Sequence, residues 1–438
     1  MTCLPSKIFG VTSFVLTALY TTFATIVLIA CSNSEPAGLN GNDGSTIDYL
    51  PLDDTEYPYA GIPRIVIETK NHREIKDRET EIPAKLQIWG EKAPESEILD
   101  LTIRGRGNTS WTIMPKKSYK IEFVNKQNIL GMSKDRDWAL IANYADKSLI
   151  KNYLMYHLSA NLDAYYAPRC EFAELYINKE YLGVYLLTET IKIANNRINI
   201  SKDRDSYIVE FDERYRKGEQ VFFSKIIRNN SVGKPFHIHE PKDATKEQIS
   251  TIEDHITKFE IFLKQINSKI NNHIEQWIDV DEYIKHYWVQ EFSKNPDADF
   301  YSSVYFSWEK NNLIKFGPVW DFDLAFGNHS DETRNTPENW FIKKAYWNIY
   351  MFKDSTMRIK HRAYWEKNLN IFLSSLNTVD SLSKALQAAA GNNFKKWDVL
   401  GRKKNYHRTT YSSYEEAIED LKTWIHNRIT WINKELLI

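Results

Sequence analysis

The sequence predicts an α+β fold, because strand-like and helix-like patterns occupy different halves of the chain. Short alternating or β-branched runs dominate up to about residue 212, and patterns with apolar residues three and four apart dominate after about residue 243. Hydrophobic residues make up 42% of the 438 residues and charged residues 26%, which is typical of a globular protein. We therefore expect one folded domain over residues 61–438, with a β-rich lobe at 61–212 and a helical lobe at 243–438.

The N-terminal segment predicts export. A single charge, Lys7, precedes an apolar run over residues 8–30, which ends in Leu-Ile-Ala before Cys31, as in a bacterial lipobox. Residues 1–31 are the predicted lipoprotein signal segment, with Cys31 as the lipidated residue. The alternative is an uncleaved membrane anchor, because the run is long enough to span a bilayer. No Lys or Arg lies between Cys31 and Arg64, so we expect the folded part outside the cytoplasm, anchored at the cell envelope or surface.

Residues 32–60 predict a flexible linker, because Ser, Asn, Gly, Pro and Asp dominate this stretch and cannot bury a core. The chain has three cysteines, and cleavage with lipidation would leave Cys170 as the one free thiol, so no internal disulfide is expected. Cys170 itself is expected to be a small buried residue. The formal net charge of -1 gives no electrostatic argument for a nucleic-acid partner.

The β-rich lobe is predicted to be an antiparallel sheet. Its strand-like runs are separated by Pro and polar clusters and fall at residues 65–67, 84–89, 99–103 and 119–123. Asp146 is placed to cap a helix from Lys147 to about residue 162. Residues 172–187 predict two strands around a turn, and residues 207–211 predict a further strand.

The second half is predicted to be mainly helical. Apolar residues three and four apart over 249–266 predict an amphipathic helix. Two capping motifs, Asp279 with Glu282 and Ser413 with Glu416, mark the starts of a middle helix and of the last helix. The middle helix leads directly into an acidic stretch.

Residues 295–328 form that stretch, and the candidate functional residues gather around it. An alternating aromatic run over 301–308, a polar turn and a second strand at 313–316 predict a β-hairpin. Acids flank both open ends, so four carboxylates are expected to converge: Asp297, Asp299, Asp321 and Asp323. Carboxylates beside bulky apolar residues are costly unless they are paired or hold a hard cation such as Mg2+. Turn capping and pairing with Lys or Arg are the alternative.

Six short motifs carry a family resemblance. They are Asn295-x-Asp297 with Ser303 and Tyr305, and the runs RGRGNTSW at 104–111, DRDW at 135–138, ANYADKS at 142–148, YLGVYLLTE at 181–189 and WDFDLAFG at 320–327. Together they resemble the CotH kinase family, the spore-coat-protein-H-like atypical protein kinases, over roughly residues 60–435. The resemblance implies an atypical protein-kinase-like fold, with a β-rich N-terminal lobe, a helix-rich C-terminal lobe and nucleotide bound between them.

The resemblance also implies roles for the acids. Familiar kinases use a catalytic-loop Asp and a metal-binding Asp, with a short hairpin between them. By this resemblance Asp297 is the catalytic base and Asp321 the Mg2+ ligand, with Asp323 and Asn295 as further candidate metal ligands. The sequence departs from the familiar pattern, because Lys294-Asn-Pro-Asp297 replaces His-Arg-Asp and Asp323 replaces the Gly of the DFG turn.

Candidate nucleotide-binding residues lie earlier in the chain. Arg104 and Arg106 alternate with Gly, and Gly allows close backbone approach while Arg offers forked donors to phosphate; an ordinary hairpin turn is the alternative. A strand Lys that reaches the phosphates is a kinase feature, and the sequence does not decide between Lys117 and Lys120. Glu189 ends a strand that is either the hinge that contacts adenine or an ordinary strand end.

His237 and His239 fall on one face of a predicted strand. Two His could bind zinc, but no third ligand is apparent in the sequence, so a structural role is expected.

The resemblance implies an exported, lipid-anchored kinase that uses ATP and Mg2+ and transfers the γ-phosphate to Ser or Thr of an unidentified protein substrate. The alternative is a catalytically inactive cell-surface binding or structural protein on the same fold. The scarcity of ATP outside the bacterial cytoplasm favours the alternative, whereas the intact acids at Asp297, Asp321 and Asp323 favour the kinase.

Overall fold

Strand-like runs in the N-terminal half pair into a closed barrel with the strand order β1-β2-β3-β4-β5-β7-β6. Neighbouring strands are antiparallel except β1 and β6, which are parallel. Alternate side chains point inward and form an apolar core that includes Ile65, Ile103, Ile121 and Leu175. The strands are β1 (Arg64–Thr69), β2 (Ile82–Trp89), β3 (Leu99–Arg106), β4 (Ser118–Gln127), β5 (Asp135–Ile141), β6 (Cys170–Ile177) and β7 (Glu180–Glu189), and a short helix α1 (Thr109–Thr112) follows β3.

The computed structural model describes residues 52, 54–91, 94–202, 205–228, 232–267, 272–402 and 409–438. The export segment, the predicted lipidation site Cys31 and most of the predicted linker lie outside the described residues. No helix in the described ranges combines the length and apolar character needed to cross a bilayer.

A second, antiparallel sheet has the strand order β12-β11-β8-β10-β9. Its strands are β8 (Ser206–Phe211), β9 (Val221–Phe223), β10 (Pro235–Glu240), β11 (Val304–Glu309) and β12 (Lys315–Phe316). The hairpin predicted from the alternating aromatic run is β11 and β12. The structure differs from the sequence-based grouping in one respect, because β8 pairs with β11 and β10 and not with the barrel. Every residue of β8 is buried, so this strand needs neighbours on both edges, and the second sheet supplies them.

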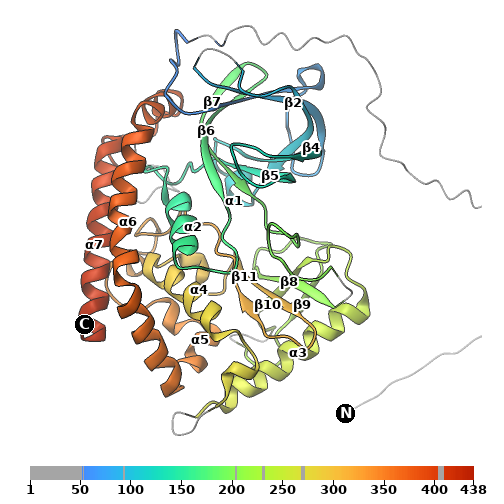
Figure 1. The fold of residues 1–438 in the computed structure, drawn as a ribbon, viewed down its shortest axis with the longest axis vertical. Helices are drawn as coiled ribbons and strands as arrows, with labels where there is room; N and C mark the ends of the chain where they lie inside the picture. Colours follow the sequence, from blue (N-terminus) through green and yellow to red (C-terminus); the bar gives the residue numbers. More distant parts are fainter. Residues whose placement is uncertain are drawn as a thin grey trace, which may run out of the picture. The chain divides into compact units, whose positions relative to one another are not determined.

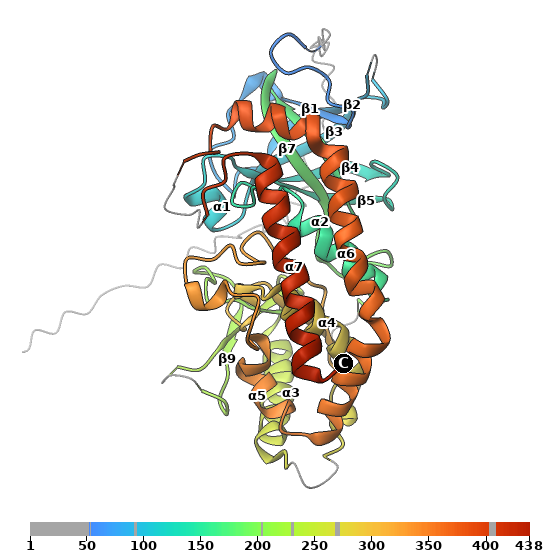
Figure 2. The ribbon, with the colours of Figure 1, turned by 90° about the vertical axis from the view of Figure 1, so that its left-hand side faces the viewer.

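The helices pack below and beside the second sheet, and α6 and α7 run side by side along one flank of the molecule (Figures 1 and 2). They are α2 (Lys151–Asn161), α3 (Lys246–Gln265), α4 (Val280–Ser293), α5 (Tyr346–Met351), α6 (Ser355–Lys396) and α7 (Tyr414–Leu436). Short 3-10 turns lie at Lys70–His72, Ile274–Gln276, Pro296–Ala298, Glu332–Arg334 and Ile342–Lys344. The side chains of Asp279 and Ser413 cap α4 and α7 as the sequence predicts.

Helix α6 is long enough to contact both the barrel and the helical region. Its 42 residues correspond to about 63 Å. Near its N-terminal end Trp365 packs on Trp288 of α4, with ring centroids 4.7 Å apart. At its C-terminal end Asn393 accepts a hydrogen bond from the backbone N–H of Val184 in β7, and Trp397 donates one to the carbonyl of Leu182.

Helix α2 begins later than the sequence predicts. The expected start was Lys147, but residues 147–149 form a turn and the helix starts at Lys151. Leu149 has a φ of 64°, a left-handed conformation that a right-handed helix excludes. Asp146 still accepts hydrogen bonds from the backbone of Ser148 and Lys151, so it stabilises the turn that precedes the helix.

An aromatic cluster joins the second sheet to the helices. Phe211 of β8, Phe306 of β11 and Phe236 of β10 all contact Trp347 of α5, with centroids 5.0 to 6.0 Å apart. Cys170 is buried, as expected. The α+β prediction is confirmed by a barrel, a second sheet and a large helical region.

Candidate active site

A cleft of about 820 Å³ lies between the barrel and the second sheet. The barrel side is formed by the end of β3, the loop into α1 and one face of β4. The opposite side is formed by β8, β10 and the loops that flank the β11–β12 hairpin. The cleft therefore gathers residues that are more than 200 positions apart in the sequence, including Arg106 and Asp321.

Three of the four predicted acids line this cleft. Asp297 lies in the 3-10 turn directly after α4, and Asp321 and Asp323 follow β12. The hairpin brings the two ends together, as the sequence predicts. Asp299 does not face the cleft, because its carboxylate lies 3.5 Å from the guanidinium of Arg334.

Asn295 lies beneath the acids and positions their backbone. The side chain is almost fully buried, and its Nδ2 donates to the carbonyl of Asp321 over 3.0 Å. Its Oδ1 accepts from the backbone N–H of Asp297 over 3.3 Å. Asn295 is not among the residues that line the cleft, so the structure does not bring its side chain together with the carboxylates.

Asp321 has a left-handed backbone conformation with a φ of 62°, which only a few residue types such as Asp tolerate. Two side chains hold this conformation on either side. The amide of Asn295 binds the carbonyl of Asp321, and the Oδ1 of Asn152 accepts from the backbone N–H of Phe322 over 2.8 Å. Strained backbone of this kind persists where the surroundings fix it, and it aims the carboxylate into the cleft.

The three acids of the cleft lie close together, and the pKa of each is raised. Burial and repulsion by Asp321 raise the pKa of Asp297 to about 7, although Arg214 opposes the shift. Burial also raises the pKa of Asp321, and burial with repulsion by Asp321 and Asp297 raises that of Asp323 well above its usual value. The cationic groups around these carboxylates thus do not balance their charge. Oxygen ligands in this arrangement fit a hard divalent cation such as Mg2+.

Arg214, which follows β8, contacts the candidate base. Its Nη2 lies 3.2 Å from Oδ2 of Asp297 and 2.5 Å from the hydroxyl of Ser302. This ion pair orients the carboxylate of Asp297 and leaves its other oxygen for different contacts. Arg214 was not predicted from the sequence.

The two predicted phosphate-binding arginines line the cleft. Arg106 packs over the ring of Trp320, 4.8 Å from its centroid. The positive charge of Arg106 partly opposes the rise that burial causes in the pKa of Asp321. Arg104 donates to the carbonyl of Arg78 over 2.5 Å and lies 3.5 Å from Glu81. Gly107, with a φ of 98°, turns the chain after β3 in a conformation that favours glycine.

The structure separates the candidate lysines. Lys116, Ser118 and Lys120 line the cleft, whereas Lys117 does not and instead donates to the carbonyl of Trp111 over 2.5 Å. Lys120 pairs with Glu122 and Asp137, each at 3.0 Å. The ammonium group of Lys116 is buried and donates to Oδ1 of Asn393 over 2.9 Å and to the carbonyl of Val184.

Glu189, the candidate adenine contact, lies away from the cleft lining. It is fully buried and forms ion pairs with Arg169 at 2.6 Å and Arg197 at 2.7 Å. The hydroxyl of Tyr166 donates a further hydrogen bond to it over 3.0 Å. These contacts tie the end of β7 to its neighbours, which is a structural role.

Sequence reasoning missed the contribution of β8. Glu210, Asp212 and Arg214 all line the cleft, and burial raises the pKa of Asp212 to about 6. Their spacing was the available signal, since charged residues at alternate positions of a buried strand and its extension share one face. His237 and His239 line the same wall, where Glu210 lies beside both.

Comparison with known proteins supports the motif-based resemblance. Residues 103–432 match the family described as CotH kinase protein, and this range covers most of the chain. No curated protein matches the chain. The chain therefore belongs to the CotH kinase family.

Proposed function

We propose that this protein is a kinase that transfers the γ-phosphate of ATP to Ser or Thr of a protein substrate. The observation that carries the proposal is the group of three crowded, half-buried carboxylates from both ends of one hairpin, which faces two arginines across a single cleft. Phosphoryl transfer needs little more than this, because catalysis is mainly the positioning of reactants and the stabilisation of charge.

The three acids have different roles in the proposed reaction. Asp321 and Asp323 would hold Mg2+, which supplies charge neutralisation on the phosphates. Asp297 would accept the proton of the substrate hydroxyl, and its pKa of about 7 suits a base at neutral pH. Arg214 keeps the Asp297 carboxylate in a fixed orientation through their 3.2 Å contact.

The barrel side would bind the nucleotide. Arg106 and Arg104 present guanidinium groups to the cleft, and charge-assisted contacts from Arg to phosphate are strong and directional. Lys120 lies on the same face but is shared between Glu122 and Asp137, so it contributes less free charge to the cleft.

We further propose that the enzyme is a lipoprotein, because its N-terminal segment resembles a lipoprotein signal segment. Cys31 would carry the lipid, and the folded part would act outside the cytoplasm, at the cell envelope or surface. The substrate is then an exported protein with an accessible Ser or Thr.

The test is calorimetric titration of ATP into the full chain, purified in detergent, with and without Mg2+, followed by transfer of labelled phosphate to a Ser-containing acceptor. We expect ATP binding that depends on Mg2+ and a measurable transfer. A folded protein that binds no nucleotide under either condition would refute the kinase and favour a binding or structural role. Binding without transfer to any acceptor, or to the protein itself, would restrict the role to nucleotide binding.

A further inference from the structure

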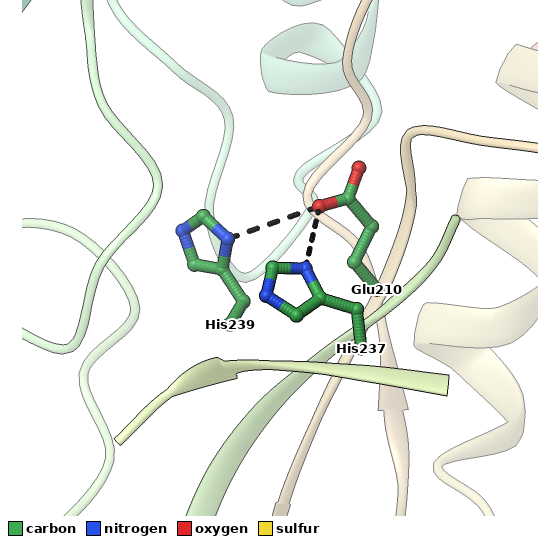
Figure 3. A group of neighbouring side chains, drawn as sticks. All are labelled: Glu210, His237 and His239. Carbon is green, nitrogen blue, oxygen red and sulfur yellow. Dashed lines mark ion pairs between the residues drawn. The ribbon is translucent and has the colours of Figure 1, made fainter. Parts of the chain in front are cut away.

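The wall of the cleft formed by β8 and β10 carries two histidines and a glutamate that point toward one another (Figure 3). In the antiparallel register His237 lies directly opposite Glu210, and His239, which lies at a bulge in this pairing, also points toward Glu210 (Figure 3). Two paired strands therefore fix all three side chains. The sequence alone predicted no third ligand for the two histidines, because the partner is 27 positions upstream of His237, on another strand.

The distances within this triad suit a shared metal ion better than direct hydrogen bonds. Nδ1 of His237 lies 3.7 Å and Nδ1 of His239 lies 3.8 Å from the same oxygen, Oε2 of Glu210. Both separations exceed hydrogen-bond length. Ligand atoms about 2.0–2.2 Å from one tetrahedral zinc ion lie roughly 3.5 Å from each other. All three ligand atoms lie within 4.8 Å of one another, so a small inward shift lets them share one ion.

Outer contacts already hold two of the three ligands in position. The Nε2 of His239 lies 3.0 Å from the carbonyl of Ile191, so Nε2 carries the hydrogen and Nδ1 presents its lone pair to the triad. The Oε1 of Glu210 accepts from the backbone N–H of Ser303 over 3.2 Å, which leaves Oε2 as the coordinating atom. Hydrogen bonds of this kind to metal-binding His and Glu side chains are typical of metal sites.

The third ligand atom lacks a hydrogen bond among the described residues. Nδ1 of His237 is buried and makes no hydrogen bond to any residue that the structure describes. A buried nitrogen without a hydrogen bond is costly, and coordination of a metal would satisfy it. The ring of His239 also packs edge-on against Tyr305, with centroids 5.5 Å apart, so its orientation does not depend on the ion.

We propose that Glu210, His237 and His239 bind a divalent transition-metal ion, Zn2+ in the first instance, with the remaining coordination position open to the cleft. Imidazole nitrogens select zinc and its neighbours, whereas the all-carboxylate group of Asp321 and Asp323 selects hard cations. Three protein ligands and one open position is the arrangement of zinc sites that bind an exogenous ligand. An anionic group of a molecule in the cleft would complete the coordination. This proposal does not depend on kinase activity.

The experiment is zinc titration of the full chain, purified in detergent without a histidine tag and stripped of metal, against a competing zinc indicator. We expect one Zn2+ per chain, unaffected by an excess of Mg2+. The variants His237→Ala, His239→Ala and Glu210→Gln should each weaken zinc binding by about 100-fold or more, since each removes one of three ligands. The matched control is His426→Ala, an exposed histidine on α7, which should bind zinc as the wild type does.

A second measurement decides the matter if a variant fails to fold. Cobalt(II) replaces zinc in such sites, and its visible absorption distinguishes a nitrogen-containing tetrahedral site from the hydrated ion, so the wild type alone gives a result. The characteristic spectrum, displaced by one equivalent of Zn2+, supports the proposal. A wild-type protein that takes up no zinc and leaves cobalt in its hydrated form would overturn it. Equal zinc binding by a folded variant that combines His237→Ala, His239→Ala and Glu210→Gln would also overturn it, because another site would then hold the ion.

Discussion

Glu189 at the end of β7 and the acids of the cleft differ in how far nearby cations balance their charge. At the end of β7, Glu189 is surrounded by Arg169, Arg197 and the hydroxyl of Tyr166, all within 3.0 Å. In the cleft, burial and repulsion by Asp321 raise the pKa of Asp297, and burial with repulsion by Asp321 and Asp297 raises the pKa of Asp323. The first group is neutralised by the chain itself, and the second is neutralised only in part.

This difference distinguishes an acid with a structural role from the acids of a candidate functional site. A buried carboxylate with matched cations stabilises the fold only modestly, but the loss of one partner is costly. Carboxylates that repel one another lower the stability of the protein, and such a group persists where a bound cation or a reaction requires it. Five changes test the comparison.

The largest effect is expected from Asp321→Ala. If Asp321 holds Mg2+, this variant should lose Mg2+-dependent ATP binding and show no detectable phosphate transfer, while it remains folded. Calorimetry with and without Mg2+ measures the first, and labelled ATP measures the second. Wild-type transfer by a folded variant would show that the cleft acids do not form the metal site.

The next largest effect concerns Asp297→Asn. A positioned base acts mainly in the transition state, so transfer should fall about 10²–10⁴-fold. ATP affinity should stay within about twofold of the wild type, because the group does not contact the nucleotide in the proposed arrangement. A parallel loss of ATP affinity would instead identify Asp297 as a metal ligand.

Glu189→Gln should act on stability and not on binding. The substitution removes the closer anionic partner of the fully buried Arg197 and leaves only Asp135 at 3.9 Å among the described residues, which costs at most about 3–5 kcal/mol for a buried pair. Chemical denaturation gives this free energy of unfolding. Mg2+ and ATP affinities at a temperature where the variant is folded should match those of the wild type, and a selective loss of ATP affinity would restore Glu189 as a nucleotide contact.

The double variant Arg104→Ala with Arg106→Ala should weaken ATP binding at least tenfold. Each charge-assisted contact to phosphate is worth roughly 1.5–3 kcal/mol. Lys117→Ala is the matched control, since Lys117 is on the same stretch of chain but outside the cleft. Affinity that is unchanged in the double variant, or reduced equally in the control, would move the phosphate site elsewhere.

The smallest effect is a pH dependence of the metal-free protein. The folded pKa of Asp297 is about 7 and the unfolded value is about 3.9, so the folded state binds more protons between these values. The stability of the protein in EDTA should therefore increase as the pH falls from about 7 toward 4.

The variant Asp323→Asn removes a carboxylate that Asp321 and Asp297 repel. The variant should raise the melting temperature at pH 7.5 by about 2 °C, or roughly 1 kcal/mol. Thermal scans of the wild type between pH 7 and pH 4, and of the variant at pH 7.5, provide the measurements. A lower melting temperature in the variant than in the wild type would contradict the charge imbalance.

The sequence predicted the acid group because the relevant signals are local. Alternating aromatics and a polar turn define the hairpin of β11 and β12, and a hairpin must bring its own ends together. The alternation of β4 likewise separates Lys120 from Lys117 once the strand is known to start at Ser118.

The remaining features depend on partners that belong to other elements. The charge of Glu189 is balanced by Arg169 and Arg197, which lie just before β6 and in the loop after β7. The zinc triad needs the register between β8 and β10, and the sequence offered no means to assign β8 to the second sheet. Pairing between strands that are distant in sequence is set by burial on both faces and by topology, so neither site could be completed from local pattern alone.

The C-terminal end of α6 has a consequence for biosynthesis. Lys116 on the barrel is buried, and its one side-chain acceptor, Asn393, lies 277 residues later in the chain. As the ribosome releases the chain, every strand of the barrel emerges well before the last turn of α6 exists. A nascent chain that ends before residue 393 therefore carries an ammonium group whose site is incomplete, and the barrel reaches its final stability only when the end of α6 docks. Termination before residue 393 thus leaves the site of Lys116, in the part of the protein that was made first, without this contact.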